Sequence, residues 1–183
     1  LPIDTFRYYY PSGELQSLVV HVNENESYAE MRYQSGELMA RGSYFGQLKD
    51  STWMFYDETG VLRAEENYIE GKRYGTWKNY YYDGKILEIQ EWENDMEHGP
   101  YKRFHHNGEK ERIATYEHGA LEGEVIDYYD NGNIRQTGDY YHDVKQGVWK
   151  HYDENGELIT EITYVKGRPQ NVPERLDDGD TTK

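Results

Sequence analysis

Residues 75–84 read GTWKNYYYDG, and residues 147–156, which begin 72 positions later, read GVWKHYDENG. Glycines recur in phase with these stretches, 23 residues apart once and 24 residues apart five times, at Gly13, Gly36, Gly60, Gly84, Gly108, Gly132 and Gly156. The residues eight positions after these glycines are His21, Tyr44, Tyr68, Trp92, Tyr116, Tyr140 and Tyr164. The residues seventeen positions after are Glu30, Trp53, Trp77, Tyr101, Val125 and Trp149. Registers that stay in phase over seven units indicate a tandem repeat.

Each unit carries two turn signals. The repeating glycine follows a turn-forming residue in the later units, namely Asp83, Asn107, Asn131 and Asn155. A second signal stands eleven residues further on, at Gly71, Asp95, Gly119, Asp143 and Gly167. Asn-Gly and Asp-Gly supply the positive φ that tight hairpin turns need, and the short segments between turns are rich in Tyr, Trp, Ile and Thr. Each unit is therefore predicted to be a β-hairpin.

A lone hairpin is marginal in water, so the units are expected to stack edge to edge. The prediction is an all-β fold in which hairpins of about 24 residues form one elongated, twisted, single-layer antiparallel meander. About seven units fill a single repeat domain over residues 1–167, and residues 168–183 are predicted to be an acidic, disordered C-terminal tail.

Strand alternation predicts which side chains share a face of this sheet. In the unit that begins at Gly60, the expected set is Leu62, Ala64, Glu66 and Tyr68. Trp77 and Tyr80 have opposite parity on the preceding strand, which leaves two alternatives open: a β-bulge intervenes, or both faces are aromatic. Glu30 is expected to replace the Trp of the second unit.

Composition limits the partners. The net charge of −15 disfavours nucleic acid and anionic membrane surfaces, and a basic or amphipathic partner protein and a monomeric chain are expected. Tyr is abundant, with 20 residues, which suits an ordered but shallow structure, and the absence of Cys excludes disulfides and thiolate sites. The chain lacks an initiator Met and a signal-peptide apolar region, and an exported location is preferred over the cytoplasm.

The sequence offers little catalytic chemistry. No nucleophile, phosphate-binding or metalloprotease motif is present, so neither an enzyme nor a cofactor is predicted. His98 could approach His118 across neighbouring second turns, whereas His105 and His106 are expected on opposite faces of a strand. Glu91, Glu93, Asp95 and Glu97 alternate around Trp92, and strand alternation predicts that these acids lie on the face away from its ring. They are interpreted as a charged solubilising face or, alternatively, as a Ca²⁺ site.

The candidate binding residues are Trp53, Trp77, Trp92 and Trp149. A Trp at a fixed repeat register is usually packing, but a single-layer sheet also leaves some aromatic surface accessible. Large exposed aromatic patches usually mark partner or ligand sites. The sequence leaves open which of the two roles these rings have.

The pattern Gly-x-aromatic, as in Gly75-Thr-Trp77, followed twice by Tyr-x-x-Gly, resembles the MORN-repeat variant family. It resembles most closely the bacterial YwqK-type branch, whose members carry an antitoxin label. The resemblance covers roughly residues 6–167 and implies the hairpin architecture. It also implies binding roles rather than one activity, and no residue here accounts for the antitoxin label.

Three functions follow as expectations. The first is a non-catalytic scaffold that binds a partner protein through an aromatic row in acidic surroundings. The second is a surface or exported glycan-binding protein that stacks sugar rings on Trp and Tyr. The third, implied by the family label alone, is an antitoxin-like neutralising protein.

Overall fold

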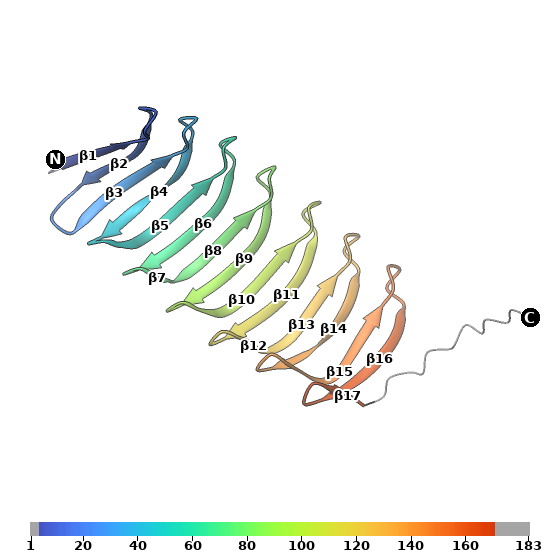
Figure 1. Cartoon of the computed structure of the whole chain (residues 1–183). Coiled ribbons are helices and arrows are strands. Elements are labelled where there is room, and N and C mark those ends of the chain that lie inside the picture. The colour runs from blue at the N-terminus through green and yellow to red at the C-terminus, as the bar shows by residue number, and fades with distance from the viewer. Residues whose placement is uncertain (1–3, 171–183) are drawn as a thin grey trace, which may run out of the picture.

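The computed structural model describes residues 4–170, and the predicted tail beyond Gln170 lies outside the described residues. These residues form one all-β antiparallel sheet of seventeen strands, a meander of hairpins that does not close into a barrel (Figure 1). The strands are β1 (Asp4–Tyr9), β2 (Leu15–His21), β3 (Glu26–Arg32), β4 (Leu38–Phe45), β5 (Leu48–Tyr56), β6 (Leu62–Ile69), β7 (Lys72–Arg73), β8 (Gly75–Tyr80), β9 (Ile86–Glu93), β10 (Met96–Phe104), β11 (Lys110–Glu117), β12 (Ala120–Leu121), β13 (Gly123–Tyr128), β14 (Ile134–Tyr141), β15 (Val144–Tyr152), β16 (Leu158–Val165) and β17 (Arg168–Pro169). The predicted fold class is confirmed.

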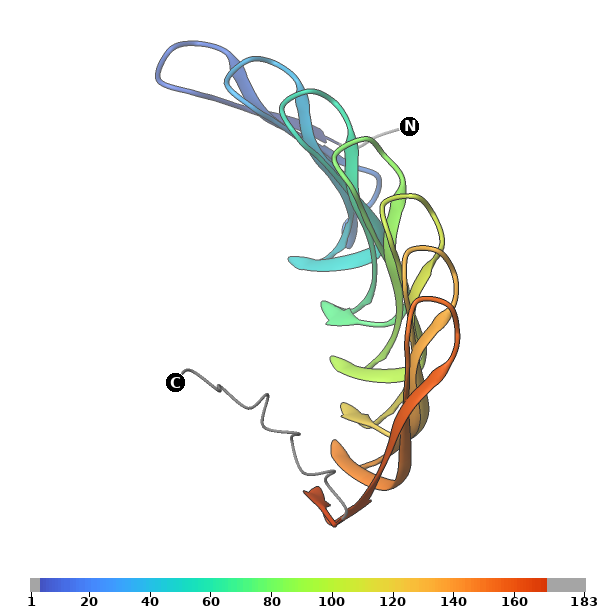
Figure 2. The same cartoon turned by 90° about the vertical axis from the view of Figure 1, so that its right-hand side faces the viewer.

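The sheet is curved along its length, and the second turns of successive hairpins project together to one side (Figure 2). The last unit includes β17, whose Arg168 pairs with Val165, so regular pairing continues past Gly167. No helix long and apolar enough to cross a membrane occurs within residues 4–170.

The first turn of each hairpin is built around its repeating glycine. In the unit of Gly84, the Tyr81 N–H donates to the carbonyl oxygen of Lys85 at 2.8 Å, and the Gly84 N–H donates to that of Tyr81 at 3.0 Å. Gly84 has a φ of +82°, a conformation that L side chains rarely adopt, which explains the glycine at this register.

Tyr side chains in the first turns join neighbouring units. The hydroxyl three residues before the glycine donates to a main-chain carbonyl oxygen of the next hairpin, as from Tyr81 to Phe104 at 2.7 Å. Tyr10, Tyr33 and Tyr129 make the same contact. His105 takes the place of Tyr in its unit and contacts the Tyr128 carbonyl oxygen. His105 and His106 thus lie at a turn, not on a strand as predicted, because the strand ends at Phe104.

Five of the second turns in the described residues are two-residue loops with positive φ at both positions, as at Asn94 (51°) and Asp95 (69°). This is the type I′ geometry favoured between twisted antiparallel strands. These turns also join neighbouring units, because the Asp95 N–H donates to the Arg73 carbonyl oxygen at 3.1 Å. Neighbouring hairpins are therefore hydrogen-bonded to each other at both turns as well as along their strands.

A corner residue with positive φ explains the Gly-x-Trp spacing. Gly75 has a φ of +70° and Gly147 a φ of +69°, and each stands two residues before a Trp. The strand is interrupted just before Gly75, at Tyr74, between β7 and β8. The chain turns at this glycine from the projecting second turn into the main strand.

Each hairpin contains a β-bulge, which shows that one residue of the predicted same-face set is placed wrongly. Phe55 pairs with Ala64 but Tyr56 pairs with Leu62, so Arg63 has no direct partner and Leu62 lies on the face opposite Ala64. The bulge therefore separates Leu62 from the set with which strand alternation had placed it. Of the two alternatives for Trp77 and Tyr80, the second holds: the two rings lie on opposite faces, because the bulge falls on the partner strand β9 and not between them.

The shortened first unit corrects a second prediction. Glu30 does not replace the missing Trp, because Ala29 pairs with Gly42 and occupies the equivalent face, whereas Glu30 pairs with Arg41 on the other. The unit from Gly13 to Gly36 is one residue shorter than the others, and a one-residue slip exchanges the faces.

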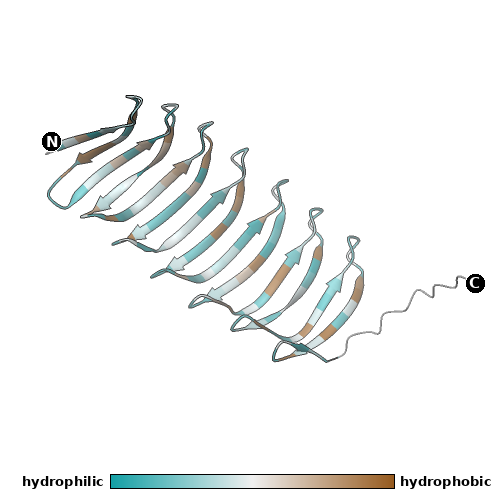
Figure 3. Cartoon of the chain, in the orientation of Figure 1, coloured by the Kyte–Doolittle hydropathy of each residue, from teal (hydrophilic) through white to brown (hydrophobic). Residues whose placement is uncertain are grey.

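The core lies on one side of the sheet. We call the side that carries Trp53, Trp77, Trp92 and Trp149 the Trp face. The buried residues of the described chain all fall on it: Ser27, Ala29, Ala40, Gly42, Trp53, Ala64, Gln90, Ala114, Val125, Asp127, Gly138 and Trp149. Hydrophobic and hydrophilic residues are interspersed along each strand (Figure 3), as expected for a sheet with a single covered face.

Candidate binding surface

Two of the four tryptophans are fully buried. The side chain of Trp53 is 0% exposed and that of Trp149 is 1% exposed. Each lies against a glycine on the preceding strand, where an added Cβ would come within 2.3 Å of the ring at both Gly42 and Gly138. Burial leaves Trp53 and Trp149 no surface to offer a partner, so their role in this structure is packing.

Hydrogen bonds hold three of the indoles in place. The Nε1–H groups of Trp53, Trp77 and Trp149 donate to main-chain carbonyl oxygens at 2.8, 2.9 and 3.2 Å. Trp92 differs, because its buried Nε1 has no hydrogen-bond partner within residues 4–170. The Trp92 ring instead packs against Trp77, at a centroid distance of 5.5 Å, and under the Arg73 guanidinium.

Cations cover several of the rings. In the five units from Gly36 to Gly132, the residues thirteen positions after the repeating glycine are Lys49, Arg73, Glu97, Leu121 and Lys145. We call this register the cover position, because its three cations lie over rings of the Trp face. The Lys145 Nζ lies 3.8 Å from the Trp149 ring centroid, and the Arg73 Cζ lies 3.8 Å from that of Trp92. Burial lowers the pKa of Lys145. A cation over an aromatic face is attracted by the ring quadrupole, so these residues help to hold the core.

Trp77 and Trp92 remain only half-buried, in the middle of the sheet. They line one wall of a cavity of about 300 Å³ that also contacts Glu88, Glu97 and Tyr101. Glu97 lies directly opposite Trp92 across the second turn, on the same face of the sheet. The predicted placement of this acid away from the Trp92 ring is wrong, because the chain reverses at Asn94–Asp95 between the two residues.

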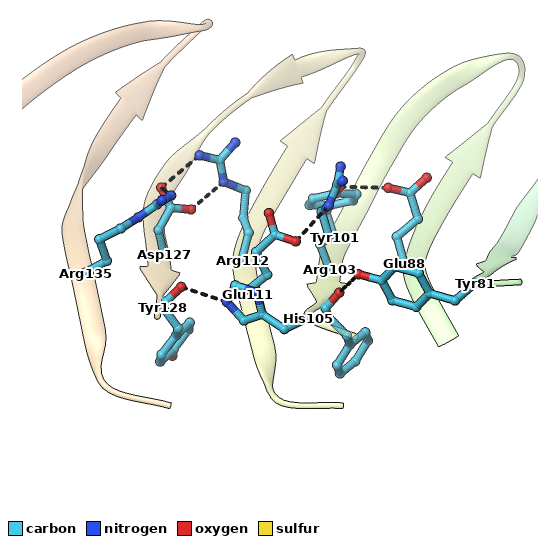
Figure 4. A network of polar contacts seen from close by, with 11 residues as sticks. Tyr81, Glu88, Tyr101, Arg103, His105, Glu111, Arg112, Asp127, Tyr128 and Arg135 are labelled. Atoms are coloured by element: carbon cyan, nitrogen blue, oxygen red, sulfur yellow. Dashed lines mark hydrogen bonds and ion pairs between the residues drawn. The ribbon is translucent and has the colours of Figure 1, made fainter. Parts of the chain in front are cut away.

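The other carboxylate of the cavity is fixed by neutral donors. The Tyr101 hydroxyl donates to Glu88 Oε2 at 2.9 Å (Figure 4), and the Asn79 amide donates to Glu88 Oε1 at 2.8 Å. Burial, reinforced by the charge of Glu88, raises the pKa of Tyr101 to about 12. This Tyr therefore stays protonated and keeps donating across the physiological range.

A separate ion pair lies two strands away. Arg112 binds the carboxylate of Asp127 through two nitrogens, at 2.5 and 2.8 Å (Figure 4). Burial of Asp127 opposes its ionisation, but hydrogen bonds from Arg112 and Gln136 outweigh that effect and lower its pKa. The Asp127 side chain is 1% exposed whereas that of Arg112 is 39% exposed, so the carboxylate belongs to the core and is engaged by Arg112 from its surface side.

The structure brings His98 and His118 together as predicted, with ring centroids 5.4 Å apart. Glu93 lies beside them, with its carboxylate 3.8 Å from His98 Nε2. Within residues 4–170, however, no group of three or more His, Cys, Asp or Glu side chains is arranged to hold a metal ion.

Sequence reasoning missed the cover position. The signal was present, since Lys49, Arg73 and Lys145 recur at 24-residue multiples, but their contacts with the rings depend on the corner that folds the second turn over the Trp face. The contact between Gly42 and Trp53 was likewise not predicted, because the residue at this register differs from unit to unit.

Comparisons with known proteins follow the same repeat. A sequence profile described as a MORN repeat variant matches residues 5–23, 49–70, 73–94, 97–118, 121–143 and 145–166. The unmatched stretch between the first two segments contains the end of the shortened unit. No curated protein matches the chain at a significant level.

Among solved structures, a chain from the "Crystal structure of GtfA/B complex bound to UDP and GlcNAc" is similar at 18% sequence identity and a TM-score of 0.25. The match covers 74% of this chain but only 24% of that one, and at this TM-score it carries no argument. The profile matches, in contrast, cover most of the chain and coincide with its hairpins, and the chain therefore belongs to the MORN repeat variant family.

Proposed function

We propose that this MORN repeat scaffold binds a partner protein through the middle of its Trp face and performs no catalytic step. One observation carries the proposal: Trp77 and Trp92 stay half-buried beside a cavity, whereas Trp53 and Trp149 are covered by the chain itself. Partly exposed aromatic rings on a rigid frame are frequent centres of protein interfaces.

Position and charge support the same surface. The middle units pack on neighbours at both sides, so their rings are held better than rings at the ends of the sheet. The acidic cavity and the net charge of −15 favour a basic or amphipathic partner and a salt-sensitive association, and they disfavour nucleic acid and anionic membranes. The scaffold acts as a monomer in this proposal.

The antitoxin label of the YwqK-type branch is compatible with this proposal, because neutralising a toxin is one form of binding a partner protein. The glycan-binding alternative would use the same rings. A glycan array separates the two, since sugar binding predicts hits that disappear when Trp77 or Trp92 is replaced.

The test is affinity capture from the source organism with the full chain and two matched variants. Trp92→Leu keeps an apolar side chain but removes the aromatic face, whereas Tyr82→Leu removes a ring that is 70% exposed on a first turn. We expect a defined partner that is lost with Trp92→Leu, retained with Tyr82→Leu and weakened by salt. Retention of every partner by the folded Trp92→Leu variant would refute the proposal.

A further inference from the structure

Three units of the sheet fill an aromatic cage with their own cation. In each, the cover residue lies over the ring four positions later and over a ring of the next unit. Lys145 Nζ is 3.8 Å from the Trp149 centroid and 5.1 Å from that of Tyr164. Lys49 repeats the arrangement with Trp53 and Tyr68 at 5.0 and 4.9 Å, and Arg73 does so with Trp77 and Trp92 at 5.9 and 3.8 Å.

The unit of Gly84 keeps the cage but reverses the charge of its cover residue. The two equivalent rings are Tyr101 and Tyr116, whose centroids lie 5.8 Å apart. The cover residue is Glu97, so no side chain of this unit supplies the cation. The cavity of about 300 Å³ lies at this cage, bounded by both Tyr rings, Glu97 and Glu88.

The carboxylates of this cage are available to a ligand. The Glu97 side chain makes no hydrogen bond or ion pair with any described residue. Glu88 accepts only the neutral donors of Tyr101 and Asn79. Burial, then the charge of Glu97, raises the pKa of Tyr116, which reflects the negative potential around this ring.

The nearby cations are engaged elsewhere. Arg103 Nε donates to Glu111 at 3.0 Å, and Arg112 is bound to the buried Asp127. The Arg73 guanidinium donates to Asp95, from Nε to the carboxylate at 3.4 Å and from Nη2 to the main-chain oxygen at 3.0 Å, and it covers Trp92 in the preceding cage. The cage at Glu97 therefore combines aromatic faces and two carboxylates without a neutralising cation of its own.

We propose that this cage receives a Lys or Arg side chain from the partner protein, in the place that Lys49 and Lys145 occupy in their own units. The inference rests on the proposed function and names the chemistry that the partner must present. Aromatic faces attract a cation that is stripped of water, and the paired carboxylates offset its desolvation. An uncharged sugar would leave both carboxylates without a counter-charge.

The cage is tested by converting it into one of its filled relatives. Glu97→Lys gives this unit the cover residue of the Lys49 and Lys145 units, so its own ammonium closes the site while the fold is kept. Glu124→Lys is the matched control, because it changes the net charge equally but lies on the opposite face, next to the buried Val125. Unchanged melting temperatures establish that all three proteins are folded.

The probe is an acetylated, amidated heptapeptide of Gly and Ser with one central Lys, and its neutral twin carries norleucine at that position. Binding to the full chain is followed through the indole N–H NMR signal of Trp92, which lines the cavity. We expect a saturable shift with the Lys peptide alone, weakened about tenfold or more by Glu97→Lys and less than about twofold by Glu124→Lys.

Equal weakening by both substitutions would show general charge attraction and overturn the proposal, as would equal binding of the norleucine peptide or no saturable shift. The capture experiment keeps the two proposals distinguishable. A partner that depends on Trp92 but is retained by Glu97→Lys would leave the scaffold function standing and refute the cation cage. Loss of the partner with both variants supports both proposals.

Discussion

The contact between Gly42 and Trp53 makes a sharp energetic prediction. A Cβ added at Gly42 would meet Trp53 Cδ2 at 2.3 Å, and Cε2 and Cγ at 2.5 Å each, well inside van der Waals contact. Both partners lie on hydrogen-bonded strands, and the Trp53 indole is held by its bond to the Ser43 carbonyl oxygen at 2.8 Å. The ring must therefore leave its position when Gly42 is replaced by Ala.

The magnitude follows from two losses. Overpacking a core costs about 1–3 kcal/mol, and losing the indole hydrogen bond adds about 1 kcal/mol. Gly42→Ala is thus expected to lower the free energy of unfolding by about 2–4 kcal/mol. Trp53→Ala alone is expected to cost about 3–5 kcal/mol, because it removes a large buried ring.

In the Trp53→Ala background, the effect of Gly42→Ala on the free energy of unfolding is expected to change sign. Without the ring, the Ala methyl has space, and replacing Gly within a strand by Ala recovers about 0.5–1 kcal/mol of chain entropy. Gly42→Ala should therefore stabilise the Trp53→Ala protein slightly. The assay is a double-mutant cycle from urea unfolding followed by circular dichroism. An equal cost of Gly42→Ala in both backgrounds would refute the packing argument.

Three further predictions test the inter-unit contacts, the buried ion pair and the shape. Tyr81→Phe removes the hydroxyl that joins two hairpins and should cost about 1 kcal/mol in urea unfolding, whereas Tyr82→Phe at an exposed ring should cost nothing measurable. Arg112→Met should cost up to about 3–5 kcal/mol at pH 7, because it removes the two-nitrogen contact of the buried Asp127 carboxylate and leaves only the half-exposed Arg135, at 3.6 Å, as its ion-pair partner. The lowered pKa of Asp127 stabilises the native protein above the unfolded pKa of about 3.9 and loses that effect as pH falls through the folded value. In the variant, burial is offset only by Arg135 and Gln136, so the pKa of Asp127 should lie above its value in the unmodified protein and the stability deficit should shrink from pH 7 to pH 4. A constant deficit would contradict the assignment. Seven hairpins at about 10 Å each should give a length of about 65–70 Å, and small-angle scattering that shows a sphere with a radius of gyration of about 16 Å would contradict the extended sheet.

The hairpin architecture was predictable because its determinants are local. Gly84 needs positive φ for the first turn, and Asp95 marks the second turn, so both ends of each hairpin are visible in the sequence. The spacing of these residues then defines the number and length of the units. Stacking follows, because a hairpin has no other way to cover its apolar face.

The details of the faces were harder to predict, because they depend on register after each turn. The bulge at Arg63 moved Leu62 to the other face, and the reversal at Asn94–Asp95 placed Glu97 beside Trp92 instead of behind it. Strand alternation alone does not predict where a bulge or a turn changes the face on which a side chain lies. The cation cage was missed for the same reason, since its walls come from neighbouring units and its cover residue from beyond a turn.

The Tyr contacts at the first turns have a consequence for how such chains can change in length. Each hydroxyl ends on a main-chain oxygen, and the residues that supply it are as different as Arg32, Tyr56 and Phe104. The contact therefore does not depend on the side chain of the residue whose carbonyl oxygen accepts the hydrogen bond. A gene duplication that inserts or deletes one whole 24-residue unit would regenerate the same joint on either side of the change. The number of repeats, and with it the length of the sheet, can therefore change in steps of about 10 Å without compensating substitutions at the new junction.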